Sequence, residues 1–400
     1  MKLALIMVGL PARGKTYIAR KISRYLSWRG HKTRVFNVGN YRREQAGAKV
    51  SHDFFDPNNQ EGMAARRHAA KEALSDMIEW FRSDGEVGIY DATNSTESRR
   101  NWVSNALESS GVQVAFIESI CDDPEIISAN IRETKLTSPD YTGIDPAKAA
   151  EDFRARISHY VAVYETVSNT QQSWIKIIDA GRQVIVNCLN NYILSRVASF
   201  VMNLHLSSRT FWFSRHGQSQ FNVMDRVGGD SRLSPNGVVY SNSLYQFFAD
   251  KQLDEIWTST LQRTIQTASP FSTERRIFKA LDEINAGICD GLTYAEIEHK
   301  YPQIAHARKV DKLGYRYPQG ESYKDVIDRL EPVIFELERS KKSTLIVAHQ
   351  AVLRALYAYF ANRPRENCPY LSIPLHTVIQ LTQKTYGCVE MRFALPPQLD

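Results

Sequence analysis

The sequence predicts two α/β domains joined in one chain. Short apolar runs with the character of strands alternate with helical patterns, which is typical of mostly parallel sheets with flanking helices. The alternation is interrupted at the polar stretch 205–209 and then starts again. A chain of 400 residues also exceeds the usual size of a single domain. We therefore expect one domain over 1–206 and a second over 207–400.

The first half of the chain supplies one series of alternating elements. Apolar runs of strand character occupy 3–8, 33–37, 87–90, 112–117 and 174–179. Helical patterns occupy 15–28, 63–82, 99–107, 146–167 and 184–203. Strands that alternate with helices in this way predict a parallel sheet covered on both faces.

The second half of the chain repeats the pattern with different spacing. Strands are predicted at 210–214, 255–257 and 344–347, and helices at 237–250, 323–338 and 352–360. The runs 378–381 and 389–392 have the composition of edge strands. The second domain is therefore also α/β.

Composition excludes several classes of protein. Hydrophobic residues make up 43% and charged residues 24%, an ordinary globular balance that excludes a disordered chain, a collagen or a coiled coil. No apolar run approaches the roughly 18 residues of a membrane helix. The net charge of +6 and the lack of a basic tail argue against nucleic acid as a partner. Five cysteines without a CxxC pair fit reduced thiols in a cytoplasmic protein.

A phosphate-binding motif follows the first predicted strand. Residues 9–16 read G-L-P-A-R-G-K-T, which matches the pattern G-x-x-x-x-G-K-[ST] between a strand and a helix. The glycines let backbone N–H groups point into one concavity at a helix N-terminus. Lys15 is expected to reach the β- and γ-phosphates of a nucleotide, and Thr16 to offer its hydroxyl to Mg²⁺. The alternative is a plain glycine-rich turn.

Other polar residues follow the strands of the first half. Asp91 ends the strand at 87–90, where a magnesium-coordinating carboxylate is placed in nucleotide-binding sheets of this kind. Its alternative role is a turn or helix-capping residue. Arg42, Arg99 and Lys135 lie after strands or near helix ends, where they can hold a second phosphate. Taken singly, each such residue is more often a solvated surface residue than a ligand-binding one.

Two histidines follow strands in the second half. His216 and His349 each come just after an apolar run, so both are expected at one edge of the sheet. A neutral imidazole can accept a phosphoryl group and form a phosphohistidine. Arg215 and Arg263 can then hold the phosphoryl oxygens, and Glu283 can protonate the leaving oxygen. A metal site is the alternative for two histidines and a glutamate, and the adjacent arginine opposes a bound cation.

A basic stretch at 308–323 offers a place for a second phosphate of the same substrate. It contains Arg308, Lys312 and Arg316, together with Tyr323. Guanidinium groups bind phosphate bidentately, so such a cluster suits a phosphorylated ligand. A solvated loop between helices is an equally good interpretation of the cluster alone.

These motifs together resemble the bifunctional 6-phosphofructo-2-kinase/fructose-2,6-bisphosphatase family over nearly the whole chain. The markers are GLPARGKT at 9–16, YRRE at 41–44, DATN at 91–94, FIESIC at 116–121, KLTSPDY at 135–141, RHGQS at 215–219, RTIQT at 263–267, YRYPQGESY at 315–323 and HQAVLR at 349–354. The resemblance implies a P-loop NTPase-like kinase domain, followed by a histidine phosphatase domain similar to phosphoglycerate mutases.

For the first half, the resemblance implies transfer of the γ-phosphoryl group of ATP to the 2-hydroxyl of fructose 6-phosphate, with Mg²⁺ on Thr16 and Asp91. The nucleotide-binding residues it implies are Gly9, Ala12, Arg13, Gly14, Lys15, Thr16, Asn130 and Lys135. Those implied for the sugar phosphate are Arg42, Arg66, Thr93, Arg99, Arg156 and Tyr160. Lys15, Asp91 and Cys121 match positions linked to kinase catalysis. The sequence shows no strong general base.

For the second half, the resemblance implies hydrolysis of fructose 2,6-bisphosphate. His216 is the implied nucleophile, Glu283 the acid, and His349 the partner that stabilises the transferring group. The residues implied around the 2-phosphate are Arg215, Asn222, Arg263 and Gln350. Those implied for the sugar and its 6-phosphate are Tyr294, Arg308, Lys312, Arg316, Tyr323 and Arg354. The resemblance also implies a cytoplasmic homodimer that regulates glycolysis against gluconeogenesis.

Three positions depart from the pattern of the family. Gln218 stands where many members have Glu, Asn285 where Asp is usual, and Ala348 where a small polar residue or Cys is expected. These changes can alter the phosphatase rate. We also expect the chain to lack the long regulatory extensions that many members carry at their termini.

Three other functions fit parts of the pattern. The first is an enzyme with both folds and one weak site. The second is a kinase–phosphatase for nucleic-acid ends, which predicts a basic aromatic groove and often a DxD phosphatase, neither of which the sequence shows. The third is a sensor without turnover, and the presence of both sets of catalytic residues disfavours it.

Overall fold

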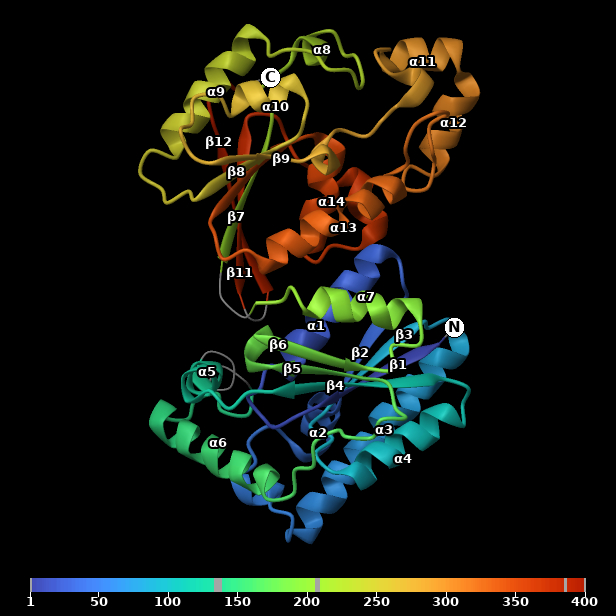
Figure 1. The fold of residues 1–400 in the computed structure, drawn as a ribbon, viewed down its shortest axis with the longest axis vertical. Helices are drawn as coiled ribbons and strands as arrows, with labels where there is room; N and C mark the ends of the chain where they lie inside the picture. Colours follow the sequence, from blue (N-terminus) through green and yellow to red (C-terminus); the bar gives the residue numbers. More distant parts are fainter. Residues whose placement is uncertain (1, 133–138, 206–208, 385–386, 399–400) are drawn as a thin grey trace. The chain divides into compact units, whose positions relative to one another are not determined.

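The computed structural model describes residues 2–132, 139–205, 209–384 and 387–398. It divides into two compact units, Met1–Leu206 and Ser207–Asp400 (Figure 1). Within the described residues, each unit has a sheet of six strands with helices packed around it. The predicted fold class is confirmed.

The sheet of the first unit is parallel except at one edge. Its strands are β1 (Leu3–Val8), β2 (Thr33–Asn37), β3 (Val87–Asp91), β4 (Gln113–Ile120), β5 (Trp174–Ile178) and β6 (Gln183–Asn187). They lie in the order β2-β3-β1-β4-β5-β6, and only β6 is antiparallel to its neighbour among the described strands. The central strand β1 is buried along its whole length, as an all-apolar strand covered on both faces should be.

The helices of the first unit connect these parallel strands. They are α1 (Lys15–Arg29), α2 (Val38–Ala46), α3 (Gln60–Ser83), α4 (Glu97–Glu108), α5 (Pro124–Asn130), α6 (Pro146–Val161) and α7 (Tyr192–Val201). A short 3₁₀ turn at His52–Phe55 lies between α2 and α3. One core cluster joins β1 and β3 to α3 and α4 through residues such as Ile6, Met77, Tyr90 and Val103.

The single helix predicted at 184–203 is wrong. The chain forms β6 and then α7, with Asn191 accepting a hydrogen bond from Leu194 N at the start of the helix. Val184 and Val186 pair with β5, because β-branched residues fit a pleated strand better than a helix. The helix predicted at 146–167 also ends earlier, at Val161, and Val167 packs into the core instead.

The sheet of the second unit is mixed. Its strands are β7 (Arg209–Arg215), β8 (Glu255–Thr258), β9 (Arg275–Ile277), β10 (Thr344–Ala348), β11 (Thr377–Lys384) and β12 (Gly387–Ala394), in the order β12-β11-β7-β10-β8-β9. The strands β7, β10, β8 and β9 are parallel, and β11 and β12 are antiparallel to their neighbours. The prediction of β11 as an edge strand is wrong, because it pairs with β7 on one side and β12 on the other.

Helices cover this second sheet and extend from it. They are α8 (Gln220–Val223), α9 (Pro235–Phe247), α10 (Gln262–Thr267), α11 (Tyr294–Lys300), α12 (Pro302–Val310), α13 (Tyr323–Arg339) and α14 (Gln350–Phe360). α11 and α12 had no counterpart in the predicted elements. They carry their own small core with Cys289 and Tyr317.

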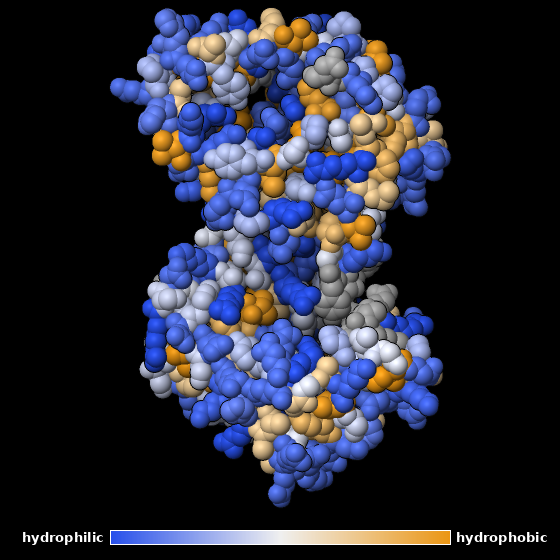
Figure 2. All heavy atoms as spheres, turned by 180° about the vertical axis from the view of Figure 1, so that it is seen from behind, coloured by the Kyte–Doolittle hydropathy of each residue, from blue (hydrophilic) through white to orange (hydrophobic). Residues whose placement is uncertain are grey.

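The hydropathy of one face of the molecule is shown in Figure 2. Hydrophilic residues cover most of the face drawn in Figure 2, and apolar residues there form small separate groups. None of the helices in the described ranges is long and apolar enough to cross a membrane.

Candidate active sites

In the first unit, the loop after β1 turns sharply around glycines. Gly9 has φ 137° and Gly14 has φ 82°, both in the region that favours glycine. A Cβ atom on Gly9 would lie 2.4 Å from the carbonyl oxygen of Ser119 on β4, so only glycine allows this approach. Lys15 is buried and its Nζ donates to the Leu10 carbonyl at 2.6 Å, within the loop itself.

Neighbouring segments hold this loop in place. Gly9 N donates to the Thr93 carbonyl at 3.0 Å, and Asn130 Nδ2 donates to the Ala12 carbonyl at 3.0 Å. Burial lowers the pKa of Arg13 from its usual value. Thr93 and Asn130, both predicted near ligands, therefore lie against the loop.

Asp91 lies at the end of β3, close to this loop in the sheet order. It is buried, pairs in register with Asn37, and accepts a hydrogen bond from Asn37 Nδ2. The Thr16 hydroxyl lies in the first turn of α1. Oxygen donors of this kind suit Mg²⁺, which needs only one or two protein ligands besides phosphates. The described residues hold no cluster of three His, Cys, Asp or Glu that would suit a different metal.

Cys121 follows β4 and is 3% exposed. Burial raises the pKa of its thiol above the usual value. At neutral pH the side chain is therefore an uncharged thiol, without the thiolate that nucleophilic cysteines need.

A cluster of arginines converges on one carboxylate. Asp140 accepts two hydrogen bonds from Arg42 Nη2, at 2.8 and 2.9 Å. Arg43 Nη1 and Arg156 Nη1 approach the same carboxylate at 3.4 and 3.5 Å. Arg42 is 4% exposed, so its partner is needed to offset the cost of burying the charge. The sequence analysis missed Asp140.

Two of these arginines, together with Arg66, surround one aromatic ring. The guanidinium of Arg156 lies 3.6 Å from the ring centre of Phe55, and those of Arg42 and Arg66 lie 5.6 and 5.9 Å away. The ring of Tyr160 is 6.2 Å from that of Phe55. Four of the residues predicted for the sugar phosphate thus meet around Phe55, which the sequence analysis also missed.

Arg99 lies apart from these contacts. Its Nη2 donates to Tyr90 OH at 3.4 Å, and its guanidinium lies 4.6 Å from the ring of Trp102. Burial raises the pKa of Tyr90 to about 12. The predicted nucleotide-binding residue Lys135 lies outside the described residues.

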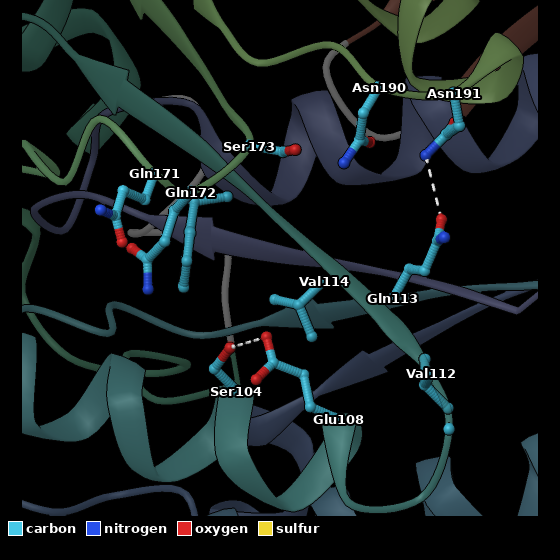
Figure 3. A pocket seen from close by; sticks show the side chains of 12 residues that line it. Ser104, Glu108, Val112, Gln113, Val114, Gln171, Gln172, Ser173, Asn190 and Asn191 are labelled. Carbon is cyan, nitrogen blue, oxygen red and sulfur yellow. Dashed lines mark hydrogen bonds between the residues drawn. The ribbon is translucent and has the colours of Figure 1, made fainter.

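A separate cavity of about 360 Å³ opens near the start of β4, whereas the phosphate loop lies near its end (Figure 3). Amide side chains such as Gln113 and Asn191 line it, and Ser104 Oγ donates to Glu108 at 2.9 Å beside it. None of the predicted site residues lines this cavity.

In the second unit, the ends of β7 and β10 bring two histidines together. These parallel strands pair Arg215 with Ala348, so His216 and His349 follow side by side. Their ring centres are 5.1 Å apart, and both residues are buried. Gly217 is required next to His216, because a Cβ there would lie 2.4 Å from the carbonyl of Gly237.

The surroundings of His216 fix its tautomer. Nδ1 lies 2.7 Å from the Gly217 carbonyl, to which only an N–H can donate. Nε2 accepts a hydrogen bond from Arg263 Nε at 3.2 Å. Burial, and then the charges of Arg263 and Arg215, lower the pKa of His216 well below its usual value. The ring is therefore neutral, with Nε2 unprotonated and facing a guanidinium.

The side chain of His349 is held by a hydrogen bond to a residue that follows a different strand, β8. Its Nε2 lies 2.8 Å from Ser259 Oγ, just beyond β8, and its Nδ1 makes no hydrogen bond to any described protein atom. Burial, followed by the charge of Arg263, lowers its pKa well below the usual value. Ser259 was not identified from the sequence.

The two arginines beside the histidines are not paired with a carboxylate through hydrogen bonds within the described contacts. Arg263 Nη1 donates to the Gly229 carbonyl at 2.7 Å, and Arg215 Nη1 to the Ile373 carbonyl at 3.3 Å. Burial lowers the pKa of Arg215 to about 10, despite the opposing effect of Glu283. Both keep their charge at neutral pH.

Glu283 lies beside the N-terminus of α14. Its Oε1 accepts from its neighbour Ile284 N at 2.9 Å and from Ala351 N at 3.1 Å. Arg329 Nη2 donates to the carbonyls of Asp282 and Glu283, which fixes the backbone here. Arg329 was not identified from the sequence.

The three departures from the family pattern have defined environments. Gln218 Oε1 accepts from Ser234 Oγ at 2.8 Å, so its amide is engaged in the loop. Asn285 Oδ1 accepts from Gly287 N at 2.8 Å, as an aspartate would. Ala348 is fully buried, and its carbonyl accepts from His216 N at 3.1 Å.

Asn222 acts locally in the structure. Its Oδ1 accepts from Ser219 N at 3.0 Å and from Ser219 Oγ at 3.1 Å, which closes the capping box of α8. Gln350 is half-buried in the first turn of α14, directly after His349.

The predicted group for a second phosphate is partly assembled. Arg354 Nη1 donates to Tyr323 OH at 3.2 Å, and Arg308 Nη2 donates to Tyr294 OH at 3.3 Å. Burial and the charges of Arg308 and Arg354 lower the pKa of Lys312 to about 8.

The charge of Arg354 also acts on Arg215, so the two basic groups adjoin each other. Arg316 is instead paired with Asp325 and is well exposed. The second basic group therefore centres on Arg308, Lys312 and Arg354.

These features define two classes of catalytic unit in one chain. Residues 1–208 match the family model described as 6-phosphofructo-2-kinase, and residues 211–395 match the histidine phosphatase superfamily, branch 1. The chain belongs to the 6-phosphofructo-2-kinase/fructose-2,6-bisphosphatase family, as the resemblance indicated.

Similar relatives cover nearly the whole chain. 6-Phosphofructo-2-kinase/fructose-2,6-bisphosphatase 4 of Rattus norvegicus is 47% identical over 96% of this chain and 83% of its own length. The enzyme of Aquarana catesbeiana is 46% identical over the same shares. 6-Phosphofructo-2-kinase/fructose-2,6-bisphosphatase 3 of Homo sapiens is 45% identical over 96% of this chain and 75% of its own.

Proposed function

We propose that this chain both synthesises and hydrolyses fructose 2,6-bisphosphate. The first unit, 1–206, is the kinase domain and the second, 207–400, is the bisphosphatase domain. The observation that supports the phosphatase most directly is the neutral His216 with Nε2 unprotonated beside Arg263. The phosphate loop at 9–16 and the arginines around Phe55 support the kinase.

The kinase step is an in-line phosphoryl transfer from ATP. The 2-hydroxyl oxygen of fructose 6-phosphate forms a bond to the γ-phosphorus, the bond from that phosphorus to the β–γ bridging oxygen breaks, and ADP leaves. The hydroxyl proton passes to solvent or to a phosphate oxygen. Lys15 and the backbone of the loop stabilise the charge on the phosphates, and catalysis depends on this positioning rather than on a strong base.

We propose that Thr16 and Asp91 hold Mg²⁺ in the kinase site. When bound, the ion neutralises charge on the β- and γ-phosphates. The chain's own part is to orient Asp91, which the amide of Asn37 does by donating to it. Arg42, Arg66, Arg156 and Tyr160 then bind the 6-phosphate of the acceptor sugar, with Thr93 and Arg99 at the edge of its site.

The phosphatase reaction begins with attack by His216. Nε2 forms a bond to the phosphorus of the 2-phosphate, and the bond from phosphorus to the sugar oxygen breaks. Glu283 gives its proton to that oxygen, which leaves as the 2-hydroxyl of fructose 6-phosphate. Arg215, Arg263 and His349 stabilise the charge on the transferring oxygens. Asn222 and Gln350 flank the phosphoryl group.

Water then completes the cycle. The carboxylate of Glu283 takes a proton from water, whose oxygen attacks the phosphorus of the phosphohistidine. The bond between phosphorus and Nε2 breaks, and inorganic phosphate leaves. Meanwhile Arg308, Lys312 and Arg354 hold the 6-phosphate, with Tyr294, Arg316 and Tyr323 around the sugar. Burial, followed by the charges of Arg308 and Arg354, lowers the pKa of Lys312 to about 8 before an anion binds.

We further propose a cytoplasmic homodimer that takes part in the control of glycolysis against gluconeogenesis. Five free cysteines suit a reducing compartment. Sedimentation of the purified protein would show a mass of twice 45.6 kDa if the dimer forms.

Labelling with fructose 2,6-bisphosphate that carries ³²P at the 2-phosphate tests the phosphatase. After an early quench we expect acid-labile, base-stable label on the protein, and none on His216→Ala. Absence of label on the wild-type protein, with substrate shown to bind, would contradict the phosphatase. Formation of the bisphosphate from ATP and fructose 6-phosphate by His216→Ala tests the kinase alone.

A further inference from the structure

One peptide group lies between two histidines of the second unit. The peptide that joins Gly217 to Gln218 accepts from His216 Nδ1 through its carbonyl, at 2.7 Å. The N–H of the same peptide donates to His376 Nε2 at 3.0 Å. Because a peptide group is planar and its C=O and N–H point in opposite directions, fixing one end fixes the other.

His376 is itself held so that it can only accept at Nε2. Its Nδ1 lies 2.6 Å from the Pro397 carbonyl, so Nδ1 carries the proton. The ring stacks on Tyr240, with centres 4.4 Å apart and planes 5° apart, and the residue is 3% exposed.

The surroundings of His376 keep its ring neutral. Burial lowers its pKa below the usual value, and the charge of Arg215 lowers it further. The carbonyl of Pro397 opposes this effect, and Tyr240 faces the ring as an uncharged phenol, because burial raises its own pKa. A neutral ring with a proton on Nδ1 leaves Nε2 as an acceptor.

The neighbouring N–H groups of the loop are anchored as well. His216 N donates to the Ala348 carbonyl at 3.1 Å, and Gly217 N donates to Thr267 Oγ1 at 2.9 Å. Three consecutive N–H groups are thus tied to β10, α10 and the segment before β11. Of these three anchors, the one at His376 belongs to the peptide whose carbonyl holds the proton of the nucleophile.

We infer that His376 is a positioning residue of the bisphosphatase: it orients the 217–218 peptide, whose carbonyl keeps the proton of His216 on Nδ1 and leaves Nε2 free to attack phosphorus. The inference rests on the proposed phosphatase activity. His376 also couples the segment at Pro397 to the nucleophile, because its ring binds both the Pro397 carbonyl and the 217–218 peptide.

Two substitutions separate the two hydrogen bonds of His376. His376→Asn keeps a short donor toward Pro397 and tolerates the φ of 52°, but does not reach the N–H of Gln218. His376→Gln places an amide oxygen about where Nε2 lies. We expect kcat for bisphosphate hydrolysis to fall about 10- to 100-fold in the Asn variant, with KM within about twofold, because the nucleophile loses its fixed tautomer. The Gln variant should retain most of the rate.

The kinase rate of the same preparations corrects for the amount of protein, because that reaction belongs to the other unit. The unchanged KM for the bisphosphate reports that the second unit keeps its fold. A wild-type kcat in the Asn variant would overturn the inference. So would equal losses in the Asn and Gln variants, since these would reflect loss of the ring rather than of the acceptor.

If the Asn variant does not fold, ¹⁵N spectra of histidine-labelled wild-type protein decide the matter. The inference requires protonated Nδ1 and unprotonated Nε2 on both His216 and His376, and the opposite tautomer on either overturns it. Failure of the proposed phosphatase activity is distinct, because the wild-type protein would then form no phosphoenzyme.

Discussion

The two sites of this protein use positive charge in opposite ways. In the first unit, the guanidinium groups of Arg42, Arg43 and Arg156 converge on Asp140. In the second unit, Arg215 and Arg263 donate to carbonyl oxygens and to a histidine ring, not to a carboxylate, within the described hydrogen bonds.

The chemistry proposed for each site explains this difference. A histidine that attacks phosphorus must be neutral, and a carboxylate in contact would raise its pKa. Burial, followed by the charges of Arg263 and Arg215, instead lowers the pKa of His216. The kinase site needs no titrating nucleophile, so an acid such as Asp140 can organise the arginines without a cost to the reaction.

The largest effect on the difference between the two sites is expected when the positive charge at the phosphate loop is removed. In Lys15→Met we expect the kinase rate to fall about 10²- to 10³-fold, because a donor to the transferring phosphates is lost. The bisphosphatase rate of the same protein should stay unchanged, and it serves as the internal control. Kinase activity above about a tenth of wild type would show that Lys15 does not contact the phosphates in the transition state.

The role of Asp140 can be tested next. In Asp140→Asn we expect KM for fructose 6-phosphate to rise about tenfold, because the arginines lose the charge that orients them. Asp152→Asn is a matched control, since Asp152 accepts from Tyr141 OH and His52 N and contacts no arginine of the cluster in the described hydrogen bonds. A fall in KM would instead show that Asp140 competes with the sugar phosphate for the arginines.

The two sites also differ in how far the sequence could predict them. The histidines at 216 and 349 could be placed together, because parallel strands end at one edge of a sheet and both follow apolar runs. Asp140 could not, because it lies 98 residues from Arg42 and no local pattern joins them.

The fold shows a similar limit. All-apolar strands such as β1 are recognisable from composition, because both faces are buried. The stretch 184–203 was not resolved into β6 and α7, because its apolar residues fit either period until pairing with β5 decides between them. His376 and Ser259 were missed for the same reason: their roles arise from contacts that only the tertiary structure supplies.

The pH dependence of stability provides a third test. Burial lowers the pKa of both His216 and His349, so they stay neutral in the folded state below pH 6.5 while the unfolded chain takes up protons. Stability is therefore present above pH 6.5 and is lost as the pH falls below it, by about 1.4 kcal/mol per pH unit for each histidine.

Hydrogen exchange of the His216 amide, which donates to Ala348, reports this loss within the second unit. In the matched variant His349→Asn, we expect a smaller slope of stability against pH between pH 6.5 and 5.5. The decrease should correspond to about one proton. An unchanged slope would mean that His349 is not buried in its neutral form.

The smallest effect is expected at Gln218, a position at which the sequence analysis expected Glu. Gln218 Oε1 accepts from Ser234 Oγ, and a carboxylate can accept the same hydrogen bond. In Gln218→Glu we therefore expect kcat of the bisphosphatase to change by less than about threefold, with the acid limb of its pH profile moved upward, because a negative charge raises the pKa of a nearby histidine.

Gln218→Leu, which removes the acceptor, is the control for the loop contact itself. A change of more than about tenfold in Gln218→Glu, with Ser234→Ala near wild type, would place the side chain on the substrate instead of on Ser234. The residue at 218 would then act on the reaction directly, and a carboxylate there would lie beside the phosphohistidine.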